Sequence, residues 1–179
     1  MKVSVHQSTL EIVQDDITQQ DTEAIGNAAN SALAGGGGVD GAIHRAGGPT
    51  LMTELRTKYQ GCPTGSAVMT GGGNLKAKYV IHAVGPRYSG SPKDAELLSS
   101  AYRSSLALCT QNNISSISFP SISTGIYGYP VEEASRIALK TVMDYLKDHP
   151  EVKLVRFVLF DPKTFNVYEE SLKEMAPSR

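Results

Sequence analysis

Four consecutive glycines, Gly35 to Gly38, constrain this chain more than any other feature. Glycine loses more backbone entropy on folding than any other residue, so four in a row inside a folded chain need a reason. The segment 39–46 that follows, VDGAIHRA, reads as a helix. The first N–H groups of that helix have no partner within it and would face the glycine loop. A loop of this kind at a helix N-terminus is suited to bind an anion, usually a phosphate.

Length and composition exclude several classes of protein. With 179 residues, 40% of them hydrophobic, the chain is expected to form a single globular domain over residues 1–179. The net charge of −1 argues against broad contact with nucleic acid, though not against a small anion such as a nucleotide. Cys62 and Cys109 form no CxxC pair and are expected to be reduced thiols. No apolar run is long enough for a signal core or a membrane span, so we expect a cytoplasmic protein without a membrane partner.

Strand-like and helix-like segments mostly alternate along the chain. Strands are expected at residues 2–6, 10–14, 24–28, 67–70, 79–84, 114–119 and 152–160, and helices at 39–46, 49–59, 94–111, 130–147 and 163–175. From residue 24 onward the alternation predicts an α/β fold, with a mainly parallel sheet covered by helices on both faces. The first two strands predict an antiparallel hairpin at the edge of that sheet.

In sheets of this kind, ligands bind at the carboxyl ends of the strands. The loops 15–18, 30–38 and 121–129 leave such ends and have unusual compositions. The last two are rich in Gly, Ser and Thr, and each leads into a helix. This suggests that both loops bind a diphosphate through neutral backbone N–H donors. The alternative for Gly35 to Gly38 is a merely flexible loop. No GxGxxG in a strand–helix context and no GxxxxGK[ST] is present, which argues against a dinucleotide oxidoreductase and a nucleotide triphosphatase.

Asp40 lies where the helix after the glycines should begin. A helix N-terminus stabilises a carboxylate by about 0.3–1 kcal/mol, so one interpretation is an ordinary helix-terminal acid. However, a phosphate held roughly 4–6 Å away would repel it by a few kcal/mol at an effective dielectric near 20. A pure binding site would avoid that repulsion, whereas a hydrolytic site can use the acid to orient a water or to stabilise a developing cation. We therefore expect Asp40 to act through water positioning and electrostatics rather than as a strong base.

Three other residues at expected strand ends are candidates for contact with a nucleotide. Asn30 offers amide donors and an acceptor suited to a ribose diol, or else it satisfies the backbone of its own loop. Asp16 is an acceptor that could take the exocyclic amine of adenine, or it caps the next turn. Phe160 could stack on a base, or it packs in the core.

Further candidates lack support from their surroundings in the sequence. His44 follows Asp40 by four residues, but no third metal ligand is evident. His82 lies inside an expected strand and is interpreted as a satisfied core residue. No GxSxG nucleophile elbow occurs, and the basic residues are scattered without interleaved aromatic residues.

Five stretches together resemble the macrodomain family, specifically its MacroD type. They are NAAN at 27–30, GGGGVDGAIHRAGGP at 35–49, CPTGSAVMT at 62–70, VIHAVGP at 80–86 and FPSISTGIYGYP at 119–130. Each glycine run alone would be weak, but their order and spacing cover nearly the whole chain. The resemblance implies a three-layer α/β/α fold with a mixed, mostly parallel sheet.

The same resemblance implies a function. The chain would bind ADP-ribose and hydrolyse its esters, which are mono-ADP-ribosyl groups on Asp and Glu side chains and O-acetyl-ADP-ribose. Its partners would be ADP-ribose, O-acetyl-ADP-ribose and mono-ADP-ribosylated proteins, with no metal or redox cofactor, and we expect a monomer. The alternatives are a non-catalytic ADP-ribose reader and, more weakly, an RNA or protein regulator that uses the cleft for a terminal nucleotide, which the near-neutral charge disfavours.

Carried over residue by residue, the resemblance assigns roles to the candidates. Asp16 would accept from the adenine amine, Ile17 would add a backbone contact and Phe160 would stack near the base. Asn30 would fix the distal ribose, and Asp40 would help to activate or place the water. The diphosphate would be held by Gly36, Gly37, Gly38, Val39, Ser123, Thr124, Gly125, Ile126 and Tyr127. Tyr127 would also close over the distal ribose.

Two positions depart from the family pattern. Asp15 stands beside the adenine acid where the family usually has Gly, so a second carboxylate is expected either to weaken nucleotide binding or to face solvent. Gly26 stands where the family usually has a β-branched residue. A glycine inside a strand costs about 0.5–1 kcal/mol, so a local loss of packing and of loop rigidity is expected there.

Overall fold

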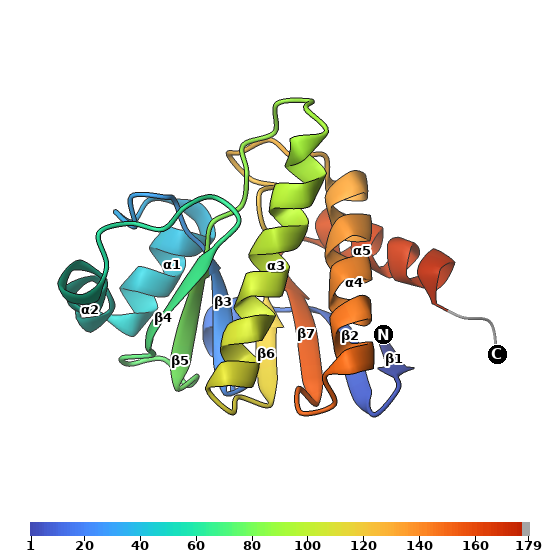
Figure 1. The fold of residues 1–179 in the computed structure, drawn as a ribbon, viewed down its shortest axis with the longest axis horizontal. Coiled ribbons are helices and arrows are strands. Elements are labelled where there is room, and N and C mark those ends of the chain that lie inside the picture. Colours follow the sequence, from blue (N-terminus) through green and yellow to red (C-terminus); the bar gives the residue numbers. More distant parts are fainter. Residues whose placement is uncertain (177–179) are drawn as a thin grey trace.

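A seven-stranded mixed sheet forms the centre of the protein (Figure 1). The structure is a computed structural model and describes residues 1–176. The strands are β1 (Lys2–Val5), β2 (Ser8–Gln14), β3 (Ala24–Ala28), β4 (Ala67–Gly71), β5 (Tyr79–Ala83), β6 (Ser116–Phe119) and β7 (Leu154–Leu159). Their order across the sheet is β1-β2-β7-β6-β3-β5-β4.

The five inner strands are parallel and both edge strands are antiparallel. The pairs β2–β7, β7–β6, β6–β3 and β3–β5 run parallel, whereas β1–β2 and β4–β5 run antiparallel. The predicted parallel sheet with an edge hairpin is therefore confirmed. The second antiparallel edge has a simple cause. Only residues 72–78 join β4 to β5, and a parallel crossover needs a dozen residues or more.

Helices cover both faces of the sheet, which confirms the three-layer α/β/α arrangement. They are η1, a single 3-10 turn (Ile17–Gln19), α1 (Gly38–Gly47), α2 (Thr50–Lys58), α3 (Lys93–Gln111), α4 (Val131–Asp148) and α5 (Pro162–Met175). The larger core lies between α3, α4, α5 and one face of the sheet, and the smaller core lies between η1, α1, α2 and the other face. In Figure 1, α3 and α4 lie in front of the strands.

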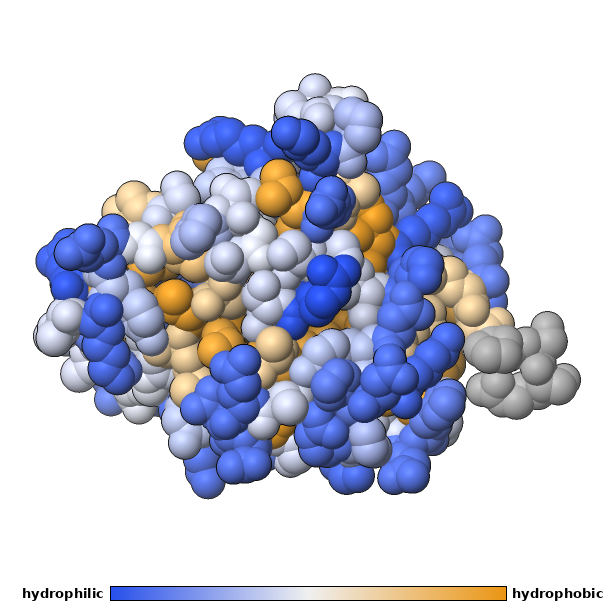
Figure 2. Space-filling view, in the orientation of Figure 1, coloured by the Kyte–Doolittle hydropathy of each residue, from blue (hydrophilic) through white to orange (hydrophobic). Residues whose placement is uncertain are grey.

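The alternation of side chains along each strand explains why these two cores lie on opposite faces of the sheet. Ala24 of β3 and Leu159 of β7 belong to the larger core, whereas their neighbours Ile25 and Val158 belong to the smaller one. Successive residues of a strand point to opposite faces, so a strand covered on both faces is apolar throughout. The outward surfaces of α3 and α4 are mostly hydrophilic, and hydrophobic residues are visible between these helices and on the side of β4 and β5 (Figure 2). Among the described residues, no helix has both the length and the apolar character that a bilayer span requires.

Gly26 does not loosen β3 as expected from the sequence. A Cβ atom at this position would lie only 2.8 Å from Cδ1 of Phe119 on the neighbouring strand β6. Phe119 is fully buried and packs edge-on against Tyr102, with ring centroids 5.1 Å apart. The ring of Phe119 thus occupies the space that a side chain at residue 26 would fill. The expected loss of packing is wrong, because a neighbouring strand supplies the missing volume.

Because the inner strands are parallel, their carboxyl ends all meet at one edge of the sheet. The loops that leave β2, β3, β5, β6 and β7 therefore gather there, along the upper side of the molecule in Figure 1. Loops 29–37 and 120–130 start from adjacent strands, because β3 and β6 are paired through Ala24 and Ile25. This arrangement brings together the glycine loop and the second small-residue loop, which are about 90 residues apart in sequence.

Candidate functional site

A cavity of about 380 Å³ opens at the carboxyl edge of the sheet. It is lined by Ala28, Ala29, Asn30, Gly36, Gly37, Gly38, Val39, Asp40, Gly85, Arg87, Ser121, Ile122, Ser123, Gly125, Ile126 and Tyr127. Asp40 is the one acidic residue of this lining, and Arg87 is the one basic residue. The structure therefore brings together most of the candidates that the sequence placed in two separate loops.

The first wall is the glycine loop and the N-terminus of α1. Gly37 precedes the helix and provides no side-chain cap. Within residues 1–176, no acceptor is found for the N–H groups of residues 36–40, and the first bonded amide is that of Gly41, which donates to the Gly37 carbonyl at 3.2 Å. Gly35 and Gly38 have φ values of +79° and +58°, which favour glycine. The positive φ values and the unbonded amides support an anion-binding loop, which stays a prediction beside the alternative of a merely flexible loop.

The second wall is the loop between β6 and α4. It is fixed by two backbone bonds, from the Gly128 amide to the Gly125 carbonyl at 3.0 Å and from the Tyr129 amide to the Ser123 carbonyl at 2.9 Å. Ser123 has a φ of +71°, a conformation that non-glycine residues adopt rarely. The amides of residues 123–127 have no acceptor in the described part of the chain. Thr124 is the one predicted residue here that does not line the cavity, and its Oγ1 lies 2.8 Å from Oγ of Ser121.

Asp40 lies in the first turn of α1, lines the cavity and is only 6% exposed. Its Oδ1 accepts a hydrogen bond from Asn27 Nδ2 at 2.8 Å and lies 3.3 Å from Nε2 of His44, one turn further along α1. Its Oδ2 makes no hydrogen bond with residues 1–176 and lies beside Gly36, 3.6 Å from where a Cβ of that glycine would be. One carboxylate oxygen is therefore held by the protein, and the other remains available toward the cavity.

A buried chain of hydrogen bonds fixes the Asn27 amide behind Asp40. The Thr70 hydroxyl donates to the Gly71 carbonyl at 3.0 Å, so its oxygen accepts from His82 Nε2 at 2.9 Å. His82 Nδ1 must then accept from Asn27 Nδ2, at 3.1 Å. Burial, with a smaller contribution from His44, lowers the pKa of His82 to about 3, so the ring is neutral at pH 7. The interpretation of His82 as a satisfied core residue is confirmed.

Asn30 belongs to the glycine loop as much as to the cavity. Its Nδ2 donates to the Gly35 carbonyl at 2.9 Å, and its Oδ1 accepts from the Ala34 amide at 3.0 Å. The side chain thus satisfies the backbone of its own loop, as the alternative interpretation anticipated. It also lines the cavity, with Nδ2 on the same side of Gly36 as the Asp40 carboxylate. Each polar atom of the amide retains one further hydrogen-bonding position.

Asp16, Ile17 and Phe160 lie outside the cavity, at the carboxyl ends of the adjacent strands β2 and β7. Oδ1 of Asp16 accepts from the backbone amide of Thr18 at 2.9 Å, so Asp16 does cap η1, while Oδ2 makes no hydrogen bond with the described residues. Ile17 is buried in the smaller core. Phe160 is 80% exposed, so the alternative of a core phenylalanine is wrong.

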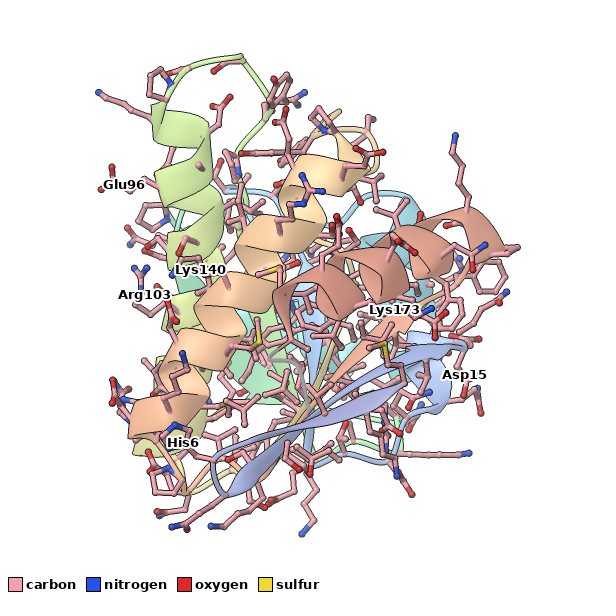
Figure 3. All side chains as sticks on the ribbon, turned by 90° about the vertical axis from the view of Figure 1, so that its right-hand side faces the viewer. His6, Asp15, Glu96, Arg103, Lys140 and Lys173 are labelled. Atoms are coloured by element: carbon pink, nitrogen blue, oxygen red, sulfur yellow. The ribbon has the colours of Figure 1, made fainter. Side chains whose placement is uncertain are left out.

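Asp15 projects into solvent beside this group (Figure 3). Its Oδ1 accepts from the Asp16 amide at 2.7 Å. Of the two expectations for this extra carboxylate, the structure supports the exposed position. The charge of Asp15 is therefore largely screened by water.

The sequence did not assign several residues of the site. Asn27, the first asparagine of NAAN, holds Asp40, and Gly85 and Arg87 close the cavity from the loop after β5. A signal for that loop was present in the sequence, because Gly85 and Pro86 directly follow the strand expected at residues 79–84. No local pattern distinguishes Asn27, since its role depends on a helix that packs over the strand.

Comparison with known proteins adds independent information. A family model described as "Macro domain" matches residues 26–138. A macro domain-containing protein of Caldanaerobacter subterraneus is 55% identical over 170 residues, covering 93% of this chain and 97% of the relative. A Cronobacter turicensis protein named O-acetyl-ADP-ribose deacetylase is 51% identical over 167 residues, covering 91% of this chain and 95% of the relative.

A solved structure of another macrodomain is also similar to this chain. The Oceanobacillus iheyensis macrodomain with ADP is 46% identical and superimposes with a TM-score of 0.93, covering 98% of this chain and 95% of that one. At this identity and coverage, the similarity extends over the whole fold, including both walls of the cavity.

Proposed function

Because this chain belongs to the macrodomain family, we propose that it binds ADP-ribose and hydrolyses esters formed on the distal ribose, with O-acetyl-ADP-ribose as one substrate. A relative that covers most of this chain carries the name O-acetyl-ADP-ribose deacetylase, and a structural neighbour binds ADP. Release of mono-ADP-ribose from Asp and Glu esters is the second activity that we propose. The chemistry is shared, because both substrates are carboxylic esters of the same sugar.

The observation that carries the proposal is two sets of unbonded backbone amides in the lining of one cavity, with the carboxylate of Asp40 in the same lining. The amides of residues 36–40 and 123–127 lack acceptors in the described chain, and both sets line one cavity. A diphosphate offers the acceptors that these amides need, and the N-terminus of α1 adds a favourable dipole. Such a grip needs no cationic side chain, which agrees with a net charge of −1.

The rest of the ligand would occupy the two ends of this grip. Asp16, through its unbonded Oδ2, and the exposed ring of Phe160 would receive the adenine, with a backbone contact from Ile17. Asn30 and Tyr127 would hold the distal ribose at the opposite end, beside Asp40. The predicted roles of Gly36, Gly37, Gly38, Val39, Ser123, Gly125 and Ile126 are kept, and Thr124 would contribute only its backbone amide.

Asp40 would act on the attacking water. Its Oδ1 is engaged by Asn27 and lies near His44, so Oδ2 is the atom that can accept a hydrogen bond from a water beside Gly36. In the net reaction, the water oxygen bonds to the acyl carbon of the ester, the bond between that carbon and the ribose oxygen breaks, and the ribose oxygen takes up a proton from the water. The products are the free sugar hydroxyl and a carboxylic acid, which loses its proton at neutral pH. Because Asp40 would position the water and act only as a weak proton acceptor, its contribution to the rate would be about 100-fold, the lower end of the range for general-base catalysis.

A non-catalytic ADP-ribose reader is the second candidate function. It is favoured by Asn30, whose amide is bonded to the glycine loop at both ends and so has a structural role without any catalysis. The two functions differ at Asp40. For an enzyme, Asp40→Ala should lower acetate release about 100-fold while the dissociation constant for ADP-ribose changes less than about tenfold. For a reader, wild-type protein would bind without turnover.

The decisive experiment measures both quantities on the same samples. Isothermal titration calorimetry gives the affinity for ADP-ribose, and acetate release from O-acetyl-ADP-ribose gives the rate. Asp144→Ala is a matched control, because Asp144 is an exposed acid on α4 that pairs with Lys140. The proposal fails if wild-type protein does not bind ADP-ribose, or if Asp40→Ala and Asp144→Ala have equal rates.

We further propose that residues 1–179 act as one macrodomain. In support, one sheet takes its strands from Lys2 through Leu159, and the relatives described above match more than nine-tenths of this chain. We also propose a monomer, which sedimentation at micromolar concentration would test.

A further inference from the structure

A second groove adjoins the cavity, on the far side of Arg87 and Tyr127. It has a volume of about 420 Å³. It is lined by Ser31, Thr64, Val84, Gly85, Pro86, Arg87, Ser89, Ser91, Lys93, Asp94, Leu97 and Tyr127. Three of these residues, Gly85, Arg87 and Tyr127, also line the first cavity. Asn30 lines the first cavity and Ser31, its neighbour in the chain, lines the groove, so the two hollows are continuous around one wall.

Arg87 and Tyr127 form that wall as a unit. The guanidinium carbon of Arg87 lies over the Tyr127 ring, 4.7 Å from its centroid. The backbones beside them are joined, because the Tyr88 amide donates to the Tyr127 carbonyl at 2.9 Å. Within residues 1–176, the guanidinium makes no hydrogen bond and no ion pair. Its donors are therefore held in place by the ring and remain available to a ligand.

Lys93 adds a second available cation to the lining of the groove. It is exposed and has no ion pair with any described residue. The nearby acid, Asp94, is already engaged. Its carboxylate accepts from the Ser89 amide at 2.9 Å, the Ser89 hydroxyl at 2.8 Å and the Gly90 amide at 2.9 Å. These bonds hold the loop and lower the pKa of Asp94, so this carboxylate serves the protein rather than a ligand.

We propose that this groove receives the acyl side of the substrate and selects esters whose modified Asp or Glu lies beside further carboxylates in a peptide. The inference rests on the proposed function, since it extends the same site beyond the distal ribose. An acyl group esterified to the ribose near Asn30 and Asp40 would extend from the first cavity into the adjoining groove. The acetyl group of O-acetyl-ADP-ribose is neutral and short and gains nothing from Arg87 or Lys93, whereas an acidic peptide meets two unpaired cations.

The expected size of the selection is modest, because both cations are exposed to solvent. Two exposed charge pairs together give about threefold to tenfold in kcat/KM, and the effect shrinks as salt screens them. The test compares three substrates at low and at high salt. They are O-acetyl-ADP-ribose, a peptide carrying one glutamate-linked ADP-ribose among Asp and Glu residues, and the same peptide with Ser and Gly as neighbours.

We expect wild-type protein to prefer the acidic peptide over the neutral one by about threefold to tenfold at 50 mM salt, with the ratio near one at 500 mM. Lys93→Gln should lower this ratio at 50 mM salt and leave hydrolysis of O-acetyl-ADP-ribose unchanged. Arg87→Gln should lower the ratio further. Arg103→Gln is the matched control, because Arg103 is an exposed cation of α3 (Figure 3) that does not line the groove, and it should keep the full preference.

The outcomes separate this inference from the proposed function. If wild-type protein neither binds ADP-ribose nor hydrolyses any of the three substrates, both are overturned. If it hydrolyses O-acetyl-ADP-ribose but shows no preference between the peptides, or a preference that survives in Lys93→Gln and Arg87→Gln alike, the groove proposal alone is overturned. An ADP-ribosylated RNA end is measured as a fourth substrate, and a preference for it over both peptides would also overturn the groove proposal.

Discussion

Protonation of His82 should make the protein markedly less stable in mild acid. The ring is fully buried, Asn27 occupies its Nδ1 and Thr70 its Nε2. Three kinds of ionisable or polar neighbour face it: Asn27 and Thr70 are neutral, His44 opposes a positive charge and Glu54 favours it weakly. The result is a pKa lowered from an ordinary 6.5 to about 3 in the folded protein.

The sign follows from proton uptake. Between pH 6.5 and pH 3 the unfolded chain binds a proton at His82 and the folded protein does not, so stability falls as the pH falls. The full contribution is present above pH 6.5, and the loss continues down to about pH 3. Between pH 7.5 and pH 5.0, a pKa difference of this size lowers the free energy of unfolding by about 2 kcal/mol. The loss of about 2 kcal/mol hardly depends on the exact pKa of His82 in the folded protein, because a pKa of about 3 lies well below pH 5.

Urea unfolding followed by circular dichroism measures this loss, and the chain has no tryptophan to follow by fluorescence. We expect His82→Gln to be less stable than wild type at pH 7.5 but to lose about 2 kcal/mol less between pH 7.5 and pH 5.0. The window lies above the ordinary range of Asp and Glu, so carboxylates contribute little to the comparison. His6→Gln, at the exposed turn between β1 and β2, is the control and should retain the wild-type slope. If the free energy of unfolding fell equally between pH 7.5 and pH 5.0 in wild type and in His82→Gln, the reasoning would be refuted.

Three further outcomes are expected. Gly26→Val should lower the free energy of unfolding by about 1–3 kcal/mol because it collides with Phe119, and Phe119→Leu in the same chain should recover part of the loss in a double-mutant cycle. Phe160→Ala should weaken ADP-ribose binding about tenfold by calorimetry without changing the melting temperature, since the ring is 80% exposed; a large change in melting temperature would contradict this. Cys109 should react with a thiol reagent at pH 8 only as fast as the protein unfolds, because burial raises its pKa to about 12, and fast labelling of the folded protein would disprove it.

Local patterns were sufficient to predict the elements of the fold. The strands and helices begin and end within a few residues of the expected positions, because hydrophobic periodicity, glycine and proline act over short distances. The run from Gly35 to Gly38 predicted an anion site at the start of a helix. The structure places unbonded amides there, beside a second set from residues 123–127. The roles of Asn30 and Asp40 in catalysis stay predictions until turnover is measured.

Local patterns failed where one segment completes another. Gly26 was interpreted as a weak point, but Phe119, about 90 residues later, fills its space. The second antiparallel edge, β4, was not anticipated, because pairing direction depends on which strand lies alongside. Arg87 looked like any loop residue until its contact with Tyr127 placed it in the wall between two hollows.

The sequence by itself therefore determined the alternation of elements, the two small-residue loops and the presence of a single acid beside the first of them. Only the tertiary structure decided which oxygen of Asp40 is engaged, that His82 stays neutral behind Asn27 and that a cationic groove continues from the cavity. The physical reason is range. Backbone preferences are set by residues a few positions apart, whereas burial, hydrogen-bond partners and charge environment are set by segments that meet only when the sheet has formed.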